Sequence, residues 1–381
     1  MENTKPKLML LFTRGVSLQV WDSIGMLERE IELYRRLLPH LSRISFLTYG
    51  DDSELRYQPL LDGIKIIPNS RRLTPTRFSI VAPFLFRKEF RDADIVKTNQ
   101  LDGAWTGVIA KLFFRKKLIV RCGYLRSFTY QKLFGDNWHT HWAFLLEKLS
   151  FKLADACIVS ASSHSTYLSK VHKIPERKVL VVPNAIDTKI FCPLPTVERE
   201  KGLVCYVGRL APEKNLDLLF DAAAGLPGIK LLIIGNGPLR AMLERKATDN
   251  KLDVEFHSRM PNHELPQFLN RACMYAQPSS YEGCPKTLLE AMSCGLPVIG
   301  TDVEGISDII CHRENGVLCD KSVQGIRDAI LSMLGDDTMA EHMGKKARQY
   351  VTEYHSIDRI VQKELEIIRM LYGQQKSEIE R

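Results

Sequence analysis

Short apolar runs alternate with longer amphipathic segments along the whole chain. Runs such as Leu8–Phe12 and Leu203–Val207 are continuously apolar, which is typical of strands buried on both faces. In segments such as Asp22–Leu38, apolar residues recur every three or four positions, which predicts an amphipathic helix. The alternation of strands and helices predicts an α/β protein with parallel sheets that helices cover on both faces.

The same pattern places the individual elements. Strands are predicted at Leu8–Phe12, Ile44–Thr48, Ile64–Ile67, Ile95–Thr98, Leu118–Arg121, Ala156–Ser160, Val179–Val182, Leu203–Val207, Lys230–Ile234, Val254–His257, Tyr275–Gln277, Pro297–Gly300 and Gly316–Leu318. Helices are predicted most clearly at Asp22–Leu38, Leu101–Phe114, Trp138–Leu153, Asn215–Ala224, Pro238–Asp249, Pro285–Cys294, Val323–Leu334, Met339–Tyr354 and Ser356–Gly373. The elements form two sets in tandem, each typical of a doubly wound sheet.

The length of 381 residues exceeds what one hydrophobic core usually supports, so two domains are expected. The joint is predicted near the proline-rich stretch 182–195. The first domain then covers residues 1–187 and the second covers residues 188–355, with a last helix at about 356–381.

Composition narrows the class of protein. Hydrophobic residues make up 45% of the chain and charged residues 26%, as in soluble globular proteins. No run of 18 apolar residues occurs, so no membrane-spanning helix is expected. The nine cysteines show no Cys-x-x-Cys spacing, which favours free thiols in a reducing cytosol over disulfides or zinc. A cytoplasmic protein is therefore expected.

The net charge of +8 is unevenly distributed. Residues 1–190 contain 30 Lys and Arg against 18 Asp and Glu, whereas residues 191–381 contain 23 against 27. Apolar residues and cations mix at Phe84–Lys88 and Lys111–Lys117, which is typical of contact with an anionic membrane and equally of helix ends leading into strands. The basic first half thus indicates a membrane or a phosphorylated acceptor, or simply a solvated surface.

The stretch 279–297 combines a polar loop, a helix start and two glutamates. Pro285 suits the first position of a helix, and Gly295 suits the position after its end. Glu282 is therefore expected on the loop and Glu290 inside the helix.

The first backbone N–H groups of this predicted helix, near Lys286, Thr287 and Leu288, have no acceptor within the helix. Such a helix start attracts an anion such as phosphate. Two carboxylates beside a phosphate site suit a ligand with hydroxyls at both ends, and a sugar nucleotide is such a ligand.

A second group of polar residues follows the predicted strand Leu203–Val207. Gly208 allows a sharp turn there, and Arg209 and Lys214 lie at the carboxyl end of the sheet, where open α/β sheets bind ligands. Two cations at this edge suit a diphosphate.

Glu282-x7-Glu290, together with Gly283, Pro285 and Gly295, resembles the signature of family 4 of the retaining glycosyltransferases. The resemblance implies the GT-B fold, in which two Rossmann-like domains face each other across a cleft. It implies that the first domain binds the acceptor, that the second binds the nucleotide sugar, and that the terminal helix crosses back to the first domain.

The resemblance also assigns roles. It implies that Arg209 and Lys214 hold the leaving diphosphate, that Glu282 holds hydroxyls of the donor sugar, and that Glu290 holds the ribose. With Glu282, these two cations are the expected catalytic residues. The remaining donor-binding residues that it implies are Gly15, Gly208, Gly235, Gly237, Arg259, Met260, Gly283, Cys284, Pro285, Lys286, Thr287 and Leu288.

The acceptor side departs from the family pattern. The family often has a histidine at the end of the fifth strand, and Arg121 occupies that position here. Arginine is not a proton acceptor at neutral pH, so Arg121 is expected to contact a phosphate or the acceptor. Ser17 and His139 are further candidates on this side, and the general base is left unassigned.

The implied reaction moves a sugar from a nucleoside diphosphate sugar to an acceptor with retention at the anomeric carbon. No metal and no further cofactor are expected, and a UDP-sugar is favoured over a GDP-sugar as donor. A glycan or lipid-linked acceptor in cell-surface polysaccharide or glycolipid assembly, at the cytoplasmic face of a membrane, fits the basic first half; nucleic acid is not expected as a partner. Two alternatives stay open: a sugar-nucleotide epimerase on the same fold, and a donor-binding protein that has lost transfer.

Overall fold

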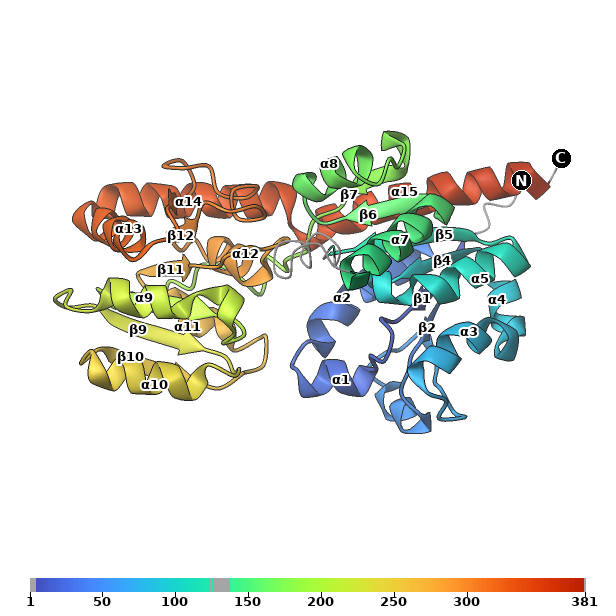
Figure 1. Ribbon diagram of the computed structural model, residues 1–381, viewed down its shortest axis with the longest axis horizontal. Helices are drawn as coiled ribbons and strands as arrows, with labels where there is room; N and C mark the ends of the chain where they lie inside the picture. The colour runs from blue at the N-terminus through green and yellow to red at the C-terminus, as the bar shows by residue number, and fades with distance from the viewer. Residues whose placement is uncertain (1–4, 124, 126–137, 380–381) are drawn as a thin grey trace. The chain divides into compact units, whose positions relative to one another are not determined.

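The computed structural model describes residues 5–123, 125 and 138–379, apart from the side chains of residues 139, 140, 143, 378 and 379. Residue contacts divide the chain into two compact units. Unit 1 consists of Met1–Pro183 and Val361–Arg381, and unit 2 consists of Asn184–Ile360. Figure 1 labels most of the helices and strands of both units.

Unit 1 contains a sheet of seven strands in the order β3-β2-β1-β4-β5-β6-β7, all of them parallel. In its centre, Leu8 lies opposite Ile44 on one side and Ile95 on the other. The strands are β1 (Lys7–Leu11), β2 (Arg43–Leu47), β3 (Ile64–Ile67), β4 (Ile95–Thr98), β5 (Lys117–Cys122), β6 (Ala156–Val159) and β7 (Val179–Val181).

Helices lie between these strands in the chain, and the last helix of the chain also belongs to this unit. They are α1 (Leu18–Ser23), α2 (Leu27–Leu37), α3 (Pro75–Leu85), α4 (Arg87–Asp92), α5 (Ala104–Phe114), α7 (Trp138–Leu153), α8 (Ser162–Lys170) and α15 (Ile357–Ile379), of which α15 belongs to this unit from Val361 onward. Short 3-10 turns occur at Leu38–His40, Asp52–Tyr57, Leu101–Gly103 and Glu176–Lys178.

Unit 2 contains a parallel sheet of six strands in the order β10-β9-β8-β11-β12-β13. The strands are β8 (Leu203–Val207), β9 (Lys230–Ile234), β10 (Asp253–His257), β11 (Met274–Gln277), β12 (Val298–Thr301) and β13 (Val317–Cys319). The helices are α9 (Leu216–Ala223), α10 (Arg240–Asp249), α11 (Leu265–Arg271), α12 (Lys286–Ser293), α13 (Val323–Gly335) and α14 (Asp337–Tyr354), with a 3-10 turn at Pro212–Lys214.

The cores explain why the central strands are apolar throughout. Along β8, Leu203 and Cys205 belong to the hydrophobic cluster on one face of the sheet, whereas Val204 and Tyr206 belong to the cluster on the other. Successive side chains of a strand point to opposite faces, so a sheet covered on both faces excludes water from every position. The predicted architecture of two parallel sheets with helices is confirmed.

One predicted helix is wrong. The sequence predicts a single helix over Asp22–Leu38, but the chain forms α1, a break, and then α2. Gly25 lies in the break with φ of 63°, a left-handed conformation that glycine adopts at little cost. Ser17 begins α1 by accepting a hydrogen bond from the backbone N–H of Val20, an N-cap that the sequence analysis overlooked.

Among the described residues, no helix combines the length and the apolar composition needed to cross a bilayer.

Candidate active site

The loops after β8 and β11 meet at the point where the strand order of unit 2 changes direction. From β8 the chain builds outward to β9 and β10, and then returns to place β11 on the other side of β8. The carboxyl ends of β8 and β11 therefore border the topological switch point, where open α/β sheets bind ligands. The loop after β8 carries Arg209 and Lys214, and the loop after β11 carries Glu282.

Lys214 and Glu282 form an ion pair across this switch point. Lys214 Nζ lies 2.6 Å from Glu282 Oε1, although the two residues are 68 positions apart in the chain. The side chains are 19% and 11% exposed, so the pair is largely withdrawn from water and still open to a ligand. The structure thus brings together two residues that the sequence analysis named independently.

Glu282 is held through one of its two carboxylate oxygens. Gln277 Nε2 and Ser279 Oγ each donate to Oε1 at 2.7 Å, in addition to Lys214. Oε2 accepts no hydrogen bond from the part of the chain that the structure describes. The carboxylate is therefore fixed in orientation while one oxygen can accept a hydrogen bond from a ligand hydroxyl.

Gln277 is the member of this network that sequence reasoning missed. It is 2% exposed at the end of β11, and its Oε1 accepts a hydrogen bond of 2.7 Å from the hydroxyl of Tyr275. That hydroxyl also lies 2.9 Å from Thr287 Oγ1 at the start of α12. Burial raises the pKa of Tyr275 well above its usual value, so the phenol stays protonated. An amide at the end of an otherwise apolar strand is the signal that could have indicated its role.

Asn215 joins the same two loops from the other side. It adopts the left-handed conformation with φ of 47°, which asparagine tolerates better than most residues. Its Nδ2 lies 2.7 Å from Ser280 Oγ and 3.1 Å from the carbonyl oxygen of Pro278. The backbone N–H of Ser280 donates to the carbonyl of Glu213, 2.8 Å away. These contacts hold Lys214, next to Asn215, at a set distance from the loop that carries Glu282.

The helix α12 begins at Lys286, with Pro285 as the residue that precedes it. Its first amides have no acceptor within the helix by geometry, as predicted for an anion site. Leu288 is fully buried, and the carbonyl of Cys284 accepts a hydrogen bond of 2.6 Å from Asn184. Glu290 lies inside α12 and is 1% exposed.

The glycines of the neighbouring loops allow close contact between backbones. A Cβ atom at Gly235 would come within 1.9 Å of the carbonyl oxygen of Gly208, and one at Gly237 within 2.2 Å of that of Leu210. Gly305 plays the same part beneath the site, where a Cβ would lie 2.4 Å from the carbonyl oxygen of Glu282. The loops after β8 and β9 therefore pack directly against each other, so the packing alone requires glycine at positions 235 and 237.

The remaining predicted donor residues lie on the surface of unit 2. Arg209 is exposed, and its carbonyl oxygen accepts a hydrogen bond of 3.1 Å from the hydroxyl of Tyr206. No ion pair of its guanidinium occurs within the described residues. Arg259 is also exposed, and Met260 packs partly against the core cluster below Glu282's loop. The backbone of Gly283 follows Glu282 directly and passes close to Gly305.

Gly15, a further residue predicted to bind the donor, belongs to unit 1, as do the predicted acceptor-side residues. Gly15 has φ of 78°, which favours glycine, and Ser17 caps α1. Arg121 lies near the end of β5, where its backbone N–H donates to Thr98 Oγ1 at 3.0 Å. The side chain of His139 lies outside the described residues.

Arg121 has charged neighbours in unit 1. Lys97 in β4 and Glu364 in α15 form a fully buried ion pair, with Nζ 2.6 Å from Oε1. Burial lowers the pKa of Lys97, and the positive charge of Arg121 lowers it further, while Glu364 opposes both. The ring of Tyr34 lies 5.5 Å from Lys97 Nζ. Arg121 thus lies within electrostatic reach of a buried charge pair that the sequence analysis did not predict.

Within residues 5–123, 125 and 138–379, no cluster of three or more His, Cys, Asp or Glu side chains is arranged to hold a metal ion.

The chain matches two family models. Residues 195–350 match the model described as "Glycosyl transferases group 1", and residues 31–190 match the one described as "Glycosyltransferase Family 4". Together the two matches cover most of both halves of the chain.

Curated relatives are similar over part of their length. An N-acetyl-alpha-D-glucosaminyl L-malate synthase from Bacillus anthracis is 26% identical over 229 residues, which cover 56% of this chain and 59% of that protein. A 2-deoxystreptamine N-acetyl-D-glucosaminyltransferase from Niallia circulans is 27% identical over 261 residues, which cover 64% of this chain and 67% of that protein. The chain therefore spans about three fifths of the length of the first of these relatives.

Solved structures are similar over nearly the whole chain. A sucrose-phosphate synthase from Thermosynechococcus elongatus has a TM-score of 0.81 at 19% identity and covers 97% of this chain and 100% of its own. Anabaena HepE in complex with UDP and glucose has a TM-score of 0.78 at 16% identity, with 96% and 100% covered. At these identities the similarity establishes the fold.

Proposed function

This chain belongs to family 4 of the glycosyltransferases, which have the GT-B fold, and we propose that it transfers a sugar from a nucleoside diphosphate sugar to an acceptor with retention at the anomeric carbon. Residues 1–187 with the last helix would bind the acceptor, and residues 188–355 would bind the donor. The donor is a UDP-sugar rather than a GDP-sugar. The acceptor is a glycan or lipid-linked molecule of polysaccharide or glycolipid assembly at the cytoplasmic face of a membrane.

The observation that carries this proposal is the fixed carboxylate of Glu282. Its Oε1 is occupied by Lys214, Gln277 and Ser279, and Oε2 can accept a hydrogen bond from a hydroxyl of the donor sugar. The first amides of α12, which have no acceptor within the helix, follow the same loop and suit the distal phosphate. Glu290 would hold the ribose hydroxyls. Its side chain in α12 is only 1% exposed, so the residues around it would have to shift locally to let the ribose reach it.

In the proposed reaction, the bond between the anomeric carbon and the distal phosphate oxygen breaks as the acceptor oxygen bonds to the same carbon. The acceptor's proton passes to the departing phosphate oxygen, so a nucleoside diphosphate and the glycosylated acceptor are the products. Lys214 stabilises the negative charge that builds up on the diphosphate, because a cation already held by Glu282 needs little rearrangement at that moment, and the exposed Arg209 adds a second positive charge. The chain need not supply a nucleophile.

The test is a donor panel applied to the full chain. UDP- and GDP-sugars are compared by thermal stabilisation, since a bound donor raises the melting temperature by mass action, and by release of UDP or GDP with glycan and lipid-linked acceptors. We expect the strongest stabilisation with one UDP-sugar and acceptor-dependent release of UDP. Rapid epimerisation of the donor without acceptor would instead identify an epimerase. Donor binding without transfer to any acceptor of the panel would identify a binding protein.

A further inference from the structure

Unit 1 exposes large apolar side chains at the ends of α3 and α5. Phe84 is 47% exposed, Leu112 63% and Phe113 64%. The rings of Phe84 and Phe113 meet edge to face with centroids 5.0 Å apart. Two helices that pack against each other thus hold a pair of aromatic rings in water, an arrangement that costs hydrophobic free energy unless another surface covers it.

Exposed cations follow these rings closely in the sequence. Arg87 and Lys88 start α4 directly after α3, and Arg115 follows the last residue of α5. All three are exposed, and none has an ion-pair partner among the described residues. The six residues Phe84, Arg87, Lys88, Leu112, Phe113 and Arg115 are called the basic–aromatic patch below.

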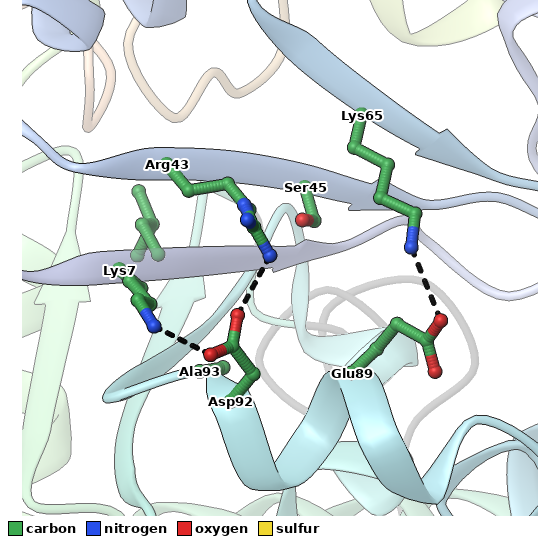
Figure 2. A pocket seen from close by; sticks show the side chains of 8 residues that line it. Lys7, Arg43, Ser45, Lys65, Glu89, Asp92 and Ala93 are labelled. Carbon is green, nitrogen blue, oxygen red and sulfur yellow. Dashed lines mark hydrogen bonds and ion pairs between the residues drawn. The ribbon is translucent and has the colours of Figure 1, made fainter.

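The acidic side chains near this patch are already neutralised. Asp155 forms an ion pair of 2.7 Å with Lys111, on α5. Figure 2 shows the adjacent edge of the sheet, where Glu89 pairs with Lys65 at 3.1 Å and Asp92 pairs with both Lys7 and Arg43. A hollow lies among these pairs, but its cations have carboxylate partners. The neighbouring carboxylates thus have cation partners of their own, and the three cations of the basic–aromatic patch have no carboxylate partner among the described residues.

Arg115 stands in an unfavourable backbone conformation. It caps α5 with φ of 53° and ψ of 41°, in the left-handed region where helices usually place glycine. A residue with a Cβ costs stability at such a position compared with glycine. The charge of Arg115 is thus kept at a site where the fold alone would favour another residue.

We propose that the basic–aromatic patch docks on an anionic membrane, with Phe84, Leu112 and Phe113 inserted at the lipid interface and the three cations on the headgroups. This inference rests on the proposed membrane-associated acceptor and assigns that contact to one surface. Aromatic and aliphatic side chains beside cations are typical of interfacial binding, and each cation adds attraction to anionic lipid. A second copy of the chain fits less well, because joining two such patches brings six unpaired cations together.

The patch and the predicted acceptor-side loops lie at opposite edges of the unit 1 sheet. A helix between two parallel strands runs opposite to them, so the last residues of α5 lie at the edge of the sheet where the strands begin. The loops with Gly15 and Arg121 lie at or near the opposite edge, where strands end. Docking through the patch therefore leaves the carboxyl edge of the unit 1 sheet uncovered.

The experiment measures sedimentation of the full chain with phosphatidylcholine vesicles, with and without phosphatidylglycerol, at low and high salt. We expect binding only with the anionic lipid, weakened by salt. Arg115→Gly should reduce the partition coefficient roughly fivefold, and Phe113→Ser roughly tenfold. Arg115→Gly should not lower the melting temperature, because glycine suits the left-handed position, so its loss of binding cannot come from unfolding.

Lys173→Gly is the matched control. Lys173 is also an exposed cation of unit 1 with a left-handed backbone, φ of 57°, but it follows α8, which packs on β6 and β7. Its substitution removes the same charge and should leave vesicle binding unchanged. Equal losses of vesicle binding in Arg115→Gly and Lys173→Gly would overturn the proposal. Absence of binding to anionic vesicles would also overturn it, and so would self-association of the chain that Phe113→Ser abolishes. Stabilisation by UDP, measured on the same samples, reports separately on the proposed donor site.

Discussion

Two lysine–glutamate pairs of the same length lie in different surroundings. Lys97 and Glu364 in unit 1 are 0% and 1% exposed, and Lys214 and Glu282 in unit 2 are 19% and 11% exposed; both pairs have an N–O distance of 2.6 Å. The first pair joins a central strand to α15, whereas the second joins two loops at the carboxyl edge of a sheet. Distance alone does not tell a structural pair from a candidate catalytic one.

The difference lies in what surrounds each ion pair. Glu282 receives two further donors on the same oxygen, from Gln277 and Ser279, so it keeps its orientation when Lys214 turns to a ligand. Lys97 has the ring of Tyr34 beside it and no exposed surface. A buried charge can leave its partner only at high cost, whereas a partly open one can exchange it for a phosphate. The comparison predicts that disrupting the first pair affects folding and disrupting the second affects transfer.

The largest effect is expected from Glu364→Ala. It leaves the ammonium of Lys97 buried without its counter-ion, so the free energy of unfolding should fall by about 3–5 kcal/mol. Chemical denaturation of the full chain measures it. The double variant Lys97→Met/Glu364→Leu removes both charges and should recover most of this loss. If the double variant is as unstable as Glu364→Ala, the contact between β4 and α15 matters rather than the buried charge.

The next effect is expected from Lys214→Ala. Transfer should fall at least about a hundredfold, which corresponds to about 2.7 kcal/mol of lost transition-state stabilisation, because the diphosphate loses a fixed cation. The free energy of unfolding should fall less than in Glu364→Ala, since Glu282 keeps Gln277 and Ser279 as donors. Lys246→Ala is the control: Lys246 forms a 2.7 Å pair with Asp221 and is 23% exposed, but it joins α10 to α9. Full activity in Lys214→Ala would remove the basis of the site assignment.

A smaller effect is expected from Gln277→Met, which replaces the amide by an apolar side chain of similar size. Glu282 then loses one of the donors that orient it, and transfer should fall about tenfold, mainly in kcat. A double variant with Lys214→Ala tests the mechanism. If both residues act through Glu282, their effects should be clearly less than additive, and strict additivity would mean that Gln277 acts elsewhere.

The smallest effect concerns pH. Burial lowers the pKa of Lys97 in the folded chain below its ordinary value of 10.5. Between the two pKa values the unfolded chain binds more protons than the folded one, so the contribution of Lys97 to stability should rise as pH increases through this window. Denaturation of the original chain and of Lys97→Met/Glu364→Leu at a series of pH values measures the difference. A difference that falls toward pH 10.5 would contradict the direction of the shift.

Much of the fold could be predicted from local pattern. Three elements have the predicted bounds: the strands Ile64–Ile67 and Leu203–Val207 and the helix Trp138–Leu153. In each, the spacing of the apolar residues fits one type of element. The break at Gly25 was missed because the apolar spacing continues on both sides of it. The helix α3 was not predicted either, since Pro83 in its interior argues against a helix.

The candidate site divides in the same way. Glu282, Glu290 and the start of α12 could be located because they belong to one contiguous motif, in which the sequence order fixes the loop and the helix. For Gln277 the sequence shows only an amide at the end of an apolar strand, and its partners Tyr275 and Glu282 become apparent only once β11 is packed.

By itself, the sequence determined the alternation of strands and helices, the family signature and the basic character of the first half, all of which are local or additive properties. Only the tertiary structure decided which lysine is buried. Lys97 contacts Glu364, which is 267 positions away in the chain, and nothing in the segment Ile95–Thr98 indicates that its lysine is buried. The cost of burying a charge depends on what the rest of the fold places beside it, and that is a property of packing rather than of neighbours in sequence.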